Sequence, residues 1–309
     1  MNAPYSDIRP KCLEMKRILI RHPHFNTILA EMENCLEASD DCSEPQCMLV
    51  TGDTGVGKSR LLDTFYSLHP RFINGDHTET PVLLASLPLP ATISGLFTAI
   101  LACLKAPYPD RGNIEYKHTR LIQLLSRSNT RMIILDEFQH LVERGTVRRI
   151  EVVADAIKSL INQTGLPFVL VGMPSAAAVL ECSPQLAGRF PLRMAMSAFN
   201  WIEKPADFER LLSCYEQGLP LEKASGLCDE DMPARLYLAT GGNFRSLATL
   251  IQKAVRMALM QGCTRIEQTH LVLCFDRYLA QNRKLRANPF SESAEAIEQW
   301  VTQLKEARA

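Results

Sequence analysis

The 309-residue sequence has no apolar run approaching the roughly 20 residues that a membrane-spanning helix requires. Its first residues, Met1–Asp7, lack the basic start and apolar core of a secretory signal peptide. The ten cysteines form no Cys-x-x-Cys pair, and Cys103, Cys214 and Cys274 fall in apolar patterns typical of buried thiols. We therefore expect a cytoplasmic protein with reduced cysteines and no membrane segment.

Net charge and a metal-ligand pattern are also missing. Basic and acidic residues each number 34, so bulk electrostatics do not favour nucleic-acid binding, which must come from a local patch if it occurs. Cys35, Cys42 and Cys47 form a loose cluster, but no histidine completes a zinc-type spacing. The 46% hydrophobic and 22% charged composition, without repeats or low-complexity segments, fits a soluble enzyme with one large domain plus additions.

One segment carries a phosphate-binding signature of the form Gly-x-x-x-x-Gly-Lys-Ser, placed between an apolar strand pattern and a helix start. The glycines let backbone N–H groups curl around phosphate oxygens, and the helix points its N-terminus at the anion. Lys58 is expected to reach the β- and γ-phosphates, and Ser59 to offer its hydroxyl to Mg²⁺. The predicted nucleotide-binding residues are Gly52, Asp53, Thr54, Gly55, Val56, Gly57, Lys58, Ser59 and Arg60.

A second segment, Arg131–His140, has four apolar residues followed by Asp136 and Glu137, which is typical of a Walker B strand. In that architecture Asp136 organises the Mg²⁺ shell, and Glu137 orients and deprotonates the attacking water. The alternative is a solvated acidic pair at a strand end. Because the segment accompanies a phosphate-binding loop, we expect an ATPase that converts ATP and water to ADP and phosphate.

Alternating strand and helix patterns predict a parallel sheet wrapped by helices. Strands are expected at 47–51, 81–86, 131–136, 167–172 and 192–197, and helices at 58–68, 92–104, 115–127, 148–163 and 175–181. A whole strand–helix unit separates the phosphate-binding loop from the Walker B strand along the chain. This suggests that another strand lies in space between the strand before the loop and the Walker B strand, which we call the two Walker strands.

Strand patterns stop near residue 201, and the remainder is predicted to be helical. Helices are expected at 205–217, 219–226, 230–240, 243–261, 266–281 and 291–307. The expected domains are an N-terminal helical extension over 1–46, an ATPase core over 47–200, a helical lid domain over 201–283 and a C-terminal tail over 284–309.

Two arginines indicate which kind of ATPase this is. Arg189 follows the helix after the fourth strand, where a ring ATPase exposes an arginine to the γ-phosphate of a neighbouring subunit; such a finger raises hydrolysis by about 10³- to 10⁵-fold. The alternative is a surface arginine before a strand. Arg245 lies in the first turn of a helix with Asn243 as its expected N-cap. A cation there opposes the helix dipole unless a phosphate faces it, so Arg245 is a sensor-2 candidate.

These motifs resemble the AAA+ ATPases, and more narrowly the TniB/TnsC-type transposition ATPases, which are related to the phage Mu target-selection ATPase. The resemblance spans roughly 47–250 and rests on 52–59, 133–141, 159–174, 185–190 and 241–245. It implies a P-loop AAA+ core with a parallel five-stranded sheet flanked by helices, followed by a small helical lid domain. One departure concerns sensor 1, because Met173 occupies the usual polar position and Ser175 is the nearest hydroxyl.

The resemblance implies an ATP- and Mg²⁺-dependent regulator of transposition that assembles as a ring or helical filament on double-stranded DNA. It would recruit a transposase, with a TniQ-like targeting protein as a further partner, and slow, regulated hydrolysis would disassemble it. Candidate DNA contacts, which phosphate binding would make independent of base sequence, are Lys105, Arg111, Lys117, Arg120, Arg148 and Arg149, with Arg144 beside the last two. Each charge is also compatible with an ordinary solvated face.

Other functions remain open at this stage. The same ATPase core serves loaders, remodellers and nucleotide-dependent signalling switches that grip protein and no DNA. A small-molecule kinase would need a phosphoacceptor pocket and an arginine-rich lid, whereas Glu137 is placed for water and Arg189 for a neighbour. An inactive nucleotide-binding scaffold is a further alternative, although the chain retains all four residues that activity needs, Lys58, Ser59, Asp136 and Glu137.

Overall fold

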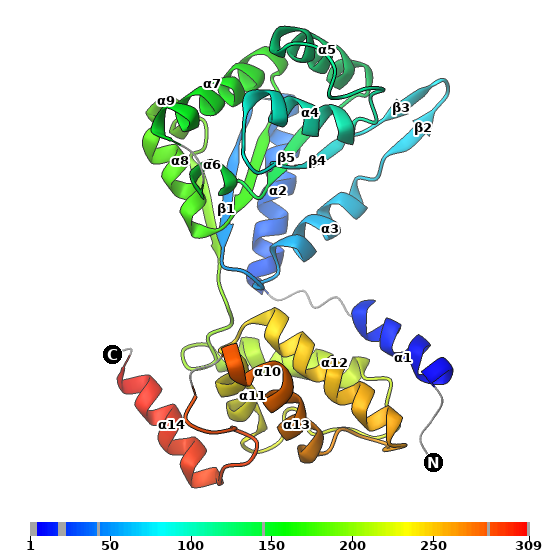
Figure 1. Cartoon of the computed structure of the whole chain (residues 1–309), viewed down its shortest axis with the longest axis vertical. Helices are drawn as coiled ribbons and strands as arrows, with labels where there is room; N and C mark the ends of the chain where they lie inside the picture. Colours follow the sequence, from blue (N-terminus) through cyan, green and yellow to red (C-terminus); the bar gives the residue numbers. More distant parts are fainter. Residues whose placement is uncertain (1–4, 18–22, 42–43, 144–145, 283–284, 308–309) are drawn as a thin grey trace. The chain divides into compact units, whose positions relative to one another are not determined.

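The computed structural model describes residues 5–17, 23–41, 44–143, 146–282 and 285–307. The chain divides into two compact units (Figure 1). The first, which we call the sheet unit, comprises His24–Ser197, and the second, the helical unit, comprises Met1–Pro23 together with Ala198–Ala309. Within the described residues, no helix combines the length and apolar character needed to cross a membrane.

The sheet unit is built on a parallel five-stranded sheet with the strand order β4-β5-β6-β1-β7. The strands are β1 (Met48–Gly52), β4 (Val82–Ser86), β5 (Met132–Asp136), β6 (Phe168–Gly172) and β7 (Leu192–Met196). In register, Val50 of β1 lies opposite Val171 of β6 on one side and Met194 of β7 on the other. The predicted strand between the two Walker strands is confirmed and is β6, whereas β4 lies at the edge.

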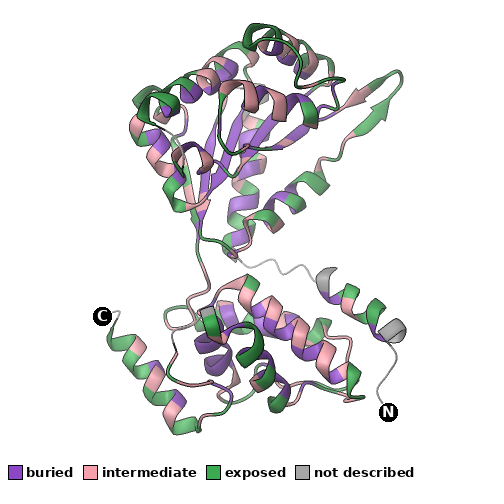
Figure 2. Cartoon of the chain, in the orientation of Figure 1, coloured by how far each residue is buried: buried purple, intermediate pink, exposed green. Residues whose placement is uncertain are grey.

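Helices cover both faces of the sheet (Figure 2). The three central strands β5, β6 and β1 are almost entirely buried, whereas the edge strand β7 has only Met196 buried. The helices of this unit, besides α2 described below, are α3 (Lys58–Leu68), α4 (Ile93–Cys103), α5 (Ile114–Arg127), α6 (His140–Glu143), α7 (Val147–Thr164), α8 (Ala177–Cys182) and α9 (Pro184–Ala187), with a 3₁₀ turn η1 (Pro174–Ala176) before α8. Polar caps set several starts: the Asn113 side chain accepts from Tyr116 N at 2.8 Å and begins α5. The core buries continuous apolar strands, as expected of a two-sided parallel sheet.

The predicted N-terminal extension is divided between the two units. Helix α2 (Pro23–Asp41) packs into the sheet unit through buried Ile28 and Met32. Two polar contacts also tie α2 to the sheet unit. The His24 ring lies 2.6 Å from the carbonyl oxygen of Ala195 in β7, and the Glu33 carboxylate lies 2.9 Å from the ring of His69, which follows α3. A hairpin that sequence reasoning missed, β2 (Phe72–Asn74) and β3 (His77–Glu79), follows α3 as a short antiparallel pair.

The helical unit contains α1 (Tyr5–Arg17), α10 (Pro205–Gly218), α11 (Met232–Thr240), α12 (Phe244–Met260), α13 (Gln268–Tyr278), a 3₁₀ turn η2 (Ala280–Asn282) and α14 (Ala294–Glu306). Met15 of α1 is buried in the apolar core of this unit. The predicted helix over 219–226 is wrong. Gly226 has a left-handed φ of 73°, and the N–H groups of Ser225 and Leu227 donate to the Glu216 carboxylate at 2.5 and 2.7 Å instead of to helix carbonyls.

Among the described cysteines, Cys35, Cys47 and Cys274 are buried thiols, whereas Cys103 and Cys214, also predicted to be buried, are only partly buried. Burial raises the pKa of Cys35 and Cys274 to about 11 and that of Cys47 to about 12, so these thiols stay protonated at neutral pH. Cys42 lies outside the described residues. Across the part of the chain that the structure describes, no group of three or more His, Cys, Asp or Glu side chains is arranged to hold a metal ion.

Candidate nucleotide site

The loop between β1 and α3 has the backbone that a phosphate-binding loop requires. Gly55 and Gly57 take left-handed φ values of 84° and 114°, which a residue with a Cβ adopts only at a cost. Gly52 lies against β7, where a Cβ would collide with the carbonyl oxygen of Met196. Glycine is therefore required here for conformation and for close approach, and Val56, which is buried, anchors the loop to the core.

Helix α3 begins at the end of this loop with Gly57 as its N-cap and no side-chain cap. Its first N–H groups and its positive dipole end therefore face the loop without a capping oxygen, an arrangement that suits an anion. The Lys58 ammonium donates to the carbonyl oxygens of Gly52 at 2.5 Å and Asp53 at 2.9 Å. Ser59 is exposed one residue further on, and Arg60 is half-buried.

Asp136 ends β5 on the same edge of the sheet, two strands from β1. Burial raises the pKa of this carboxyl, and the positive charge of Lys58 acts in the opposite direction. The Asp136 carboxylate also accepts from the N–H of Glu137 at 2.8 Å. The structure thus brings together the predicted phosphate-binding lysine and the predicted metal-binding carboxylate, although β6 separates their strands.

These residues fit a Mg²⁺-nucleotide. A half-buried carboxylate with a raised pKa gains from a divalent cation, and oxygen ligands plus phosphate are what Mg²⁺ prefers in nucleotide sites. Asp136 and the Ser59 hydroxyl are the predicted protein ligands, and the loop N–H groups with Lys58 are the predicted phosphate contacts. When bound, the metal would neutralise phosphate charge.

Glu137 follows Asp136 in a left-handed conformation with φ 56°, which is unusual for a residue with a side chain. It is exposed, so water can reach its carboxylate. The carboxylate accepts a hydrogen bond from the amide of Gln139, which sequence reasoning did not place in the site. Gln139 lies in the segment on which the family resemblance rests. Its burial is what marks it as part of the site, and the sequence does not reveal that burial.

Arg189 lies at the amino ends of the parallel strands, whereas the phosphate-binding loop lies at their carboxyl ends. It precedes β7, whose first residue is in register with the first residue of β1, and its guanidinium pairs with Glu44 at 3.1 Å. Since β1 runs five residues, or about 15 Å, from this edge to the loop, Arg189 is remote from the loop of its own subunit. Arg189 is therefore not placed to contact the nucleotide of its own subunit, and its role toward the nucleotide of a neighbouring subunit stays a prediction.

Arg245 occupies the first turn of α12 in the helical unit and is exposed. The predicted cap is confirmed, since the Asn243 side chain accepts from Ser246 N at 3.2 Å. No acidic residue lies in that turn, so the arginine opposes the helix dipole without local compensation. Its sensor-2 role stays a prediction.

The predicted DNA-contacting residues differ in exposure. The prediction that Lys117 contacts DNA is wrong, because only 4% of this residue is exposed. Its ammonium donates to the hydroxyls of Ser94 and Thr98 at 2.9 Å each, so Lys117 joins α5 to α4 inside the protein. The half-buried Arg120 donates to the carbonyl oxygens of Pro107 and Tyr108, which stabilises the loop between those helices.

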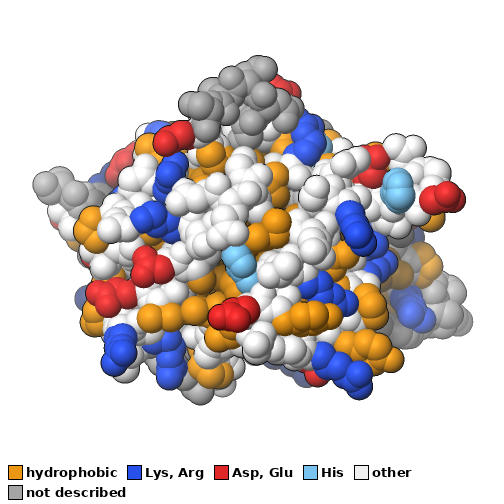
Figure 3. Space-filling view, turned by 90° about the horizontal axis from the view of Figure 1, so that it is seen from above, with side chains coloured by type: hydrophobic (Ala, Val, Ile, Leu, Met, Phe, Trp, Pro, Cys, Tyr) orange, Lys and Arg blue, Asp and Glu red, His pale blue; other side chains and the backbone are white. Residues whose placement is uncertain are grey.

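The remaining candidates lie on the surface. Lys105 is exposed, and the Arg111 guanidinium stacks on the exposed ring of Tyr108 with 4.2 Å to its centroid. Arg148 and Arg149 are exposed in the first turn of α7, whereas Arg144 lies outside the described residues. The face of the molecule seen in Figure 3 mixes basic, acidic and apolar side chains, without one broad basic field.

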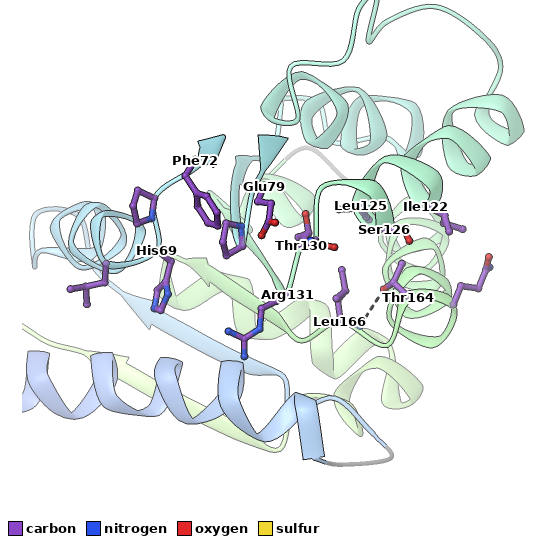
Figure 4. Close-up of a pocket in the computed structure, with 15 residues that line it drawn as sticks. His69, Phe72, Glu79, Ile122, Leu125, Ser126, Thr130, Arg131, Thr164 and Leu166 are labelled. Atoms are coloured by element: carbon purple, nitrogen blue, oxygen red, sulfur yellow. Dashed lines mark hydrogen bonds between the residues drawn. The ribbon is translucent and has the colours of Figure 1, made fainter. Parts of the chain in front are cut away.

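A separate pocket of about 970 Å³ lies in the sheet unit (Figure 4). It is bounded by the β2–β3 hairpin and by the last turns of α5 and α7, with Phe72, Leu125 and Leu166 among its apolar lining. None of the phosphate-binding residues lines it, and Arg131 lies at the start of β5 rather than at its Asp136 end. The pocket is therefore distinct from the nucleotide site.

Comparisons with known proteins agree with this geometry. The family described as bacterial TniB protein matches residues 11–199, well over half of the chain. No curated protein sequence matches. Similar solved structures include Cdc6p from Pyrobaculum aerophilum, with TM-score 0.63 and 18% identity over 85% of this chain and 69% of that one.

Two Aeropyrum pernix proteins have similar structures. The ORC2 protein in ADPNP-ADP complexes matches with TM-score 0.60 and 14% identity over 85% of this chain and 70% of that one. The ORC1 protein in complex with DNA matches with TM-score 0.58 and 18% identity over 86% and 69% respectively. At these identities the likeness establishes the fold, which is that of AAA+ ATPases, and the predicted fold class is confirmed.

Proposed function

The chain belongs to the TniB family, and from that premise we propose that it is an ATP-dependent regulator of transposition that assembles on double-stranded DNA. In this proposal ATP binding drives assembly of a ring or helical filament, the assembly recruits a transposase, and hydrolysis releases it. A TniQ-like targeting protein is the further partner that we propose. The observation that carries the proposal is geometric, in a chain of the TniB family. Lys58 begins α3 after the loop that follows β1, and Asp136 ends β5, so both lie at the carboxyl ends of strands in one parallel sheet.

The residues of the site support ATP hydrolysis as the proposed reaction. Lys58 and the loop N–H groups would hold the phosphates, while Ser59 and Asp136 would hold the magnesium ion. Glu137 would take a proton from the attacking water, for which its exposed carboxylate is suited. Arg189 of a neighbouring subunit would complete the site, so turnover depends on assembly and is slow in the monomer.

The DNA part of the proposal rests on a modest surface. Lys105 and Arg111 present charge beside the exposed ring of Tyr108, and Arg148 and Arg149 present charge at a helix start where the dipole also favours phosphate. A zero net charge gives a single subunit little attraction for DNA. Repeating the patch in every subunit of an assembly raises the affinity through multivalency.

Sedimentation of the purified protein with and without duplex DNA tests the proposal directly. The samples contain ATP, ADP or a slowly hydrolysed ATP analogue, and Lys58→Ala serves as the control that should bind no nucleotide. Large assemblies that require both triphosphate and DNA support a transposition regulator.

Each other result has a defined meaning. Assembly that requires triphosphate but ignores DNA would favour a protein-directed ATPase, such as a remodeller or a signalling switch. Unchanged sedimentation in every nucleotide would contradict the proposed assembly. Wild-type ATP affinity in Lys58→Ala would contradict the phosphate-binding loop itself.

A further inference from the structure

Gln139 joins the proposed catalytic base to the end of a neighbouring strand. It lies just after β5, and only 3% of it is exposed. Its amide nitrogen donates to the Glu137 carboxylate, and its amide oxygen accepts from the N–H of Met173 at 3.0 Å. One buried side chain therefore spans from the water-activating position to the residue that follows β6.

The neighbouring backbone is arranged around this amide. Phe138 N donates to the carbonyl oxygen of Val171 at 2.9 Å, which ties the same turn to β6. Gly172 ends β6 beside Gln139, and a Cβ there would lie 2.7 Å from the amide oxygen and so displace it. The absence of a side chain at Gly172 makes room for the amide.

The contacts also explain how Glu137 keeps its unusual backbone. A left-handed φ of 56° is strained for a residue with a Cβ, and such strain persists only where surrounding bonds hold it. Asp136 accepts from the Glu137 N–H, and Gln139 donates to its side chain, so both ends of the residue are held. A carboxylate with a short, flexible stem is thereby restricted to one direction.

We propose that Gln139 is a positioning residue that holds the Glu137 carboxylate in place and couples it to the end of β6. The proposal rests on the proposed ATPase function and deepens it. Met173 stands where a polar sensor side chain is expected after this strand, and here the link to β6 is made by a backbone N–H and the Gln139 amide instead. Movement at the end of β6 would pass directly to Glu137.

The chemistry of the amide defines the decisive variant. Gln139→Glu keeps the size and an oxygen that can accept from Met173 N, but it replaces the N–H donor with a second carboxylate facing Glu137. Side chains that orient metal ligands through a hydrogen bond change activity by about 10- to 100-fold when removed, and Gln139 holds the Glu137 carboxylate in the same way. We therefore expect kcat to fall by that factor while the KM for ATP and the affinity for a fluorescent ATP analogue stay within about twofold of wild type.

A second variant displaces the amide without altering it. Gly172→Ala introduces the Cβ that would press on Gln139, and it should lower kcat in the same direction with ATP binding retained. Gln303→Glu, at an exposed position on α14, makes the same chemical change outside the sheet unit and should leave kcat and ATP binding unchanged. Thermal unfolding of each variant identifies losses that come from misfolding.

A double-mutant cycle shows whether Gln139 acts through Glu137. If it does, adding Gln139→Glu to Glu137→Gln lowers the residual turnover no further. Additive losses, an unchanged kcat in Gln139→Glu, or a loss of ATP binding together with kcat would each overturn the proposal.

The proposed function and the role of Gln139 fail in different ways. If wild-type protein binds ATP but hydrolyses none under assembly conditions, the proposed ATPase function fails. In that case, hydrogen exchange at the Met173 amide still tests the hydrogen bond between Met173 and Gln139. Faster exchange in Gln139→Met than in wild type supports the link, and equal exchange contradicts it.

Discussion

Replacing Arg235 with methionine should destabilise the helical unit by several kcal/mol. Arg235 lies in α11 and is 6% exposed. Its guanidinium donates to the carbonyl oxygens of Pro289 at 2.6 Å and Glu292 at 2.9 Å, and to the Asp231 carboxylate at 2.7 Å. These bonds attach the segment before α14 to α11. Methionine retains the apolar stem but removes all three donors.

The magnitude follows from what happens to each acceptor. A buried polar group left without its partner costs about 1–3 kcal/mol, and two carbonyl oxygens are affected. The Asp231 side chain is 32% exposed, so water replaces its partner at little cost. We therefore expect a destabilisation of about 2–6 kcal/mol, a large part of the roughly 5–15 kcal/mol typical of a folded domain.

Tryptophan fluorescence during urea unfolding measures this destabilisation selectively. The two tryptophans of the chain, Trp201 and Trp300, pack against the apolar cluster between α11 and α14 that contains Leu238 and Ile297. Arg210→Met, at an exposed site on α10, is the matched control and should change stability by less than about 0.5 kcal/mol. An Arg235→Met transition within about 0.5 kcal/mol of wild type would refute the reasoning.

Three further predictions concern the sheet unit. Because burial raises the pKa of Asp136, its ionised form destabilises the nucleotide-free protein, so Asp136→Asn should raise the melting temperature at pH 7. This gain should vanish once the pH falls below the ordinary aspartate pKa of 3.8, and a lower melting temperature at pH 7 would contradict the reasoning. The same variant should weaken Mg²⁺-dependent ATP binding. Arg189→Ala should bind ATP but lose about 10³-fold or more in hydrolysis, and mixing it with Glu137→Gln should restore turnover if the arginine acts on a neighbour; a mixture as inactive as its components argues against that role. Lys105→Ala with Arg111→Ala should reduce the slope of log affinity for DNA against log salt by about 0.9 for each DNA phosphate that the variant no longer neutralises, and an unchanged slope would remove this loop from the DNA surface.

The strands and helices of the sheet unit were largely predictable because their signals are local. Apolar runs bounded by turn residues predicted all five strands of the parallel sheet to within one residue at each end. The helix over 58–68 begins and ends where the pattern placed it. The short β2–β3 hairpin was missed, since its two three-residue strands are mostly exposed and carry no apolar alternation.

Charge patterns were less informative, because a charged residue has the same letter inside and outside the protein. Lys117 was predicted to face DNA, yet α4 and α5 pack so that Ser94 and Thr98 enclose its ammonium. Gln139 is not predicted for a different reason: its importance comes from burial and from the Met173 N–H, which lies 34 positions away along the chain. Neither interaction has a periodic or spacing signal.

By itself, the sequence predicted the chemistry of this protein: a glycine-rich loop with Lys58 and an apolar strand ending in Asp136 and Glu137 indicate nucleotide binding through short-range backbone and side-chain requirements. Only the tertiary structure decided that β6 lies between the two Walker strands and that α1 and α2 belong to different units. It also decided that Gln139 links Glu137 to β6. Strand order and burial depend on which apolar faces pack together across the whole chain, and that choice is made by long-range packing that no local pattern encodes.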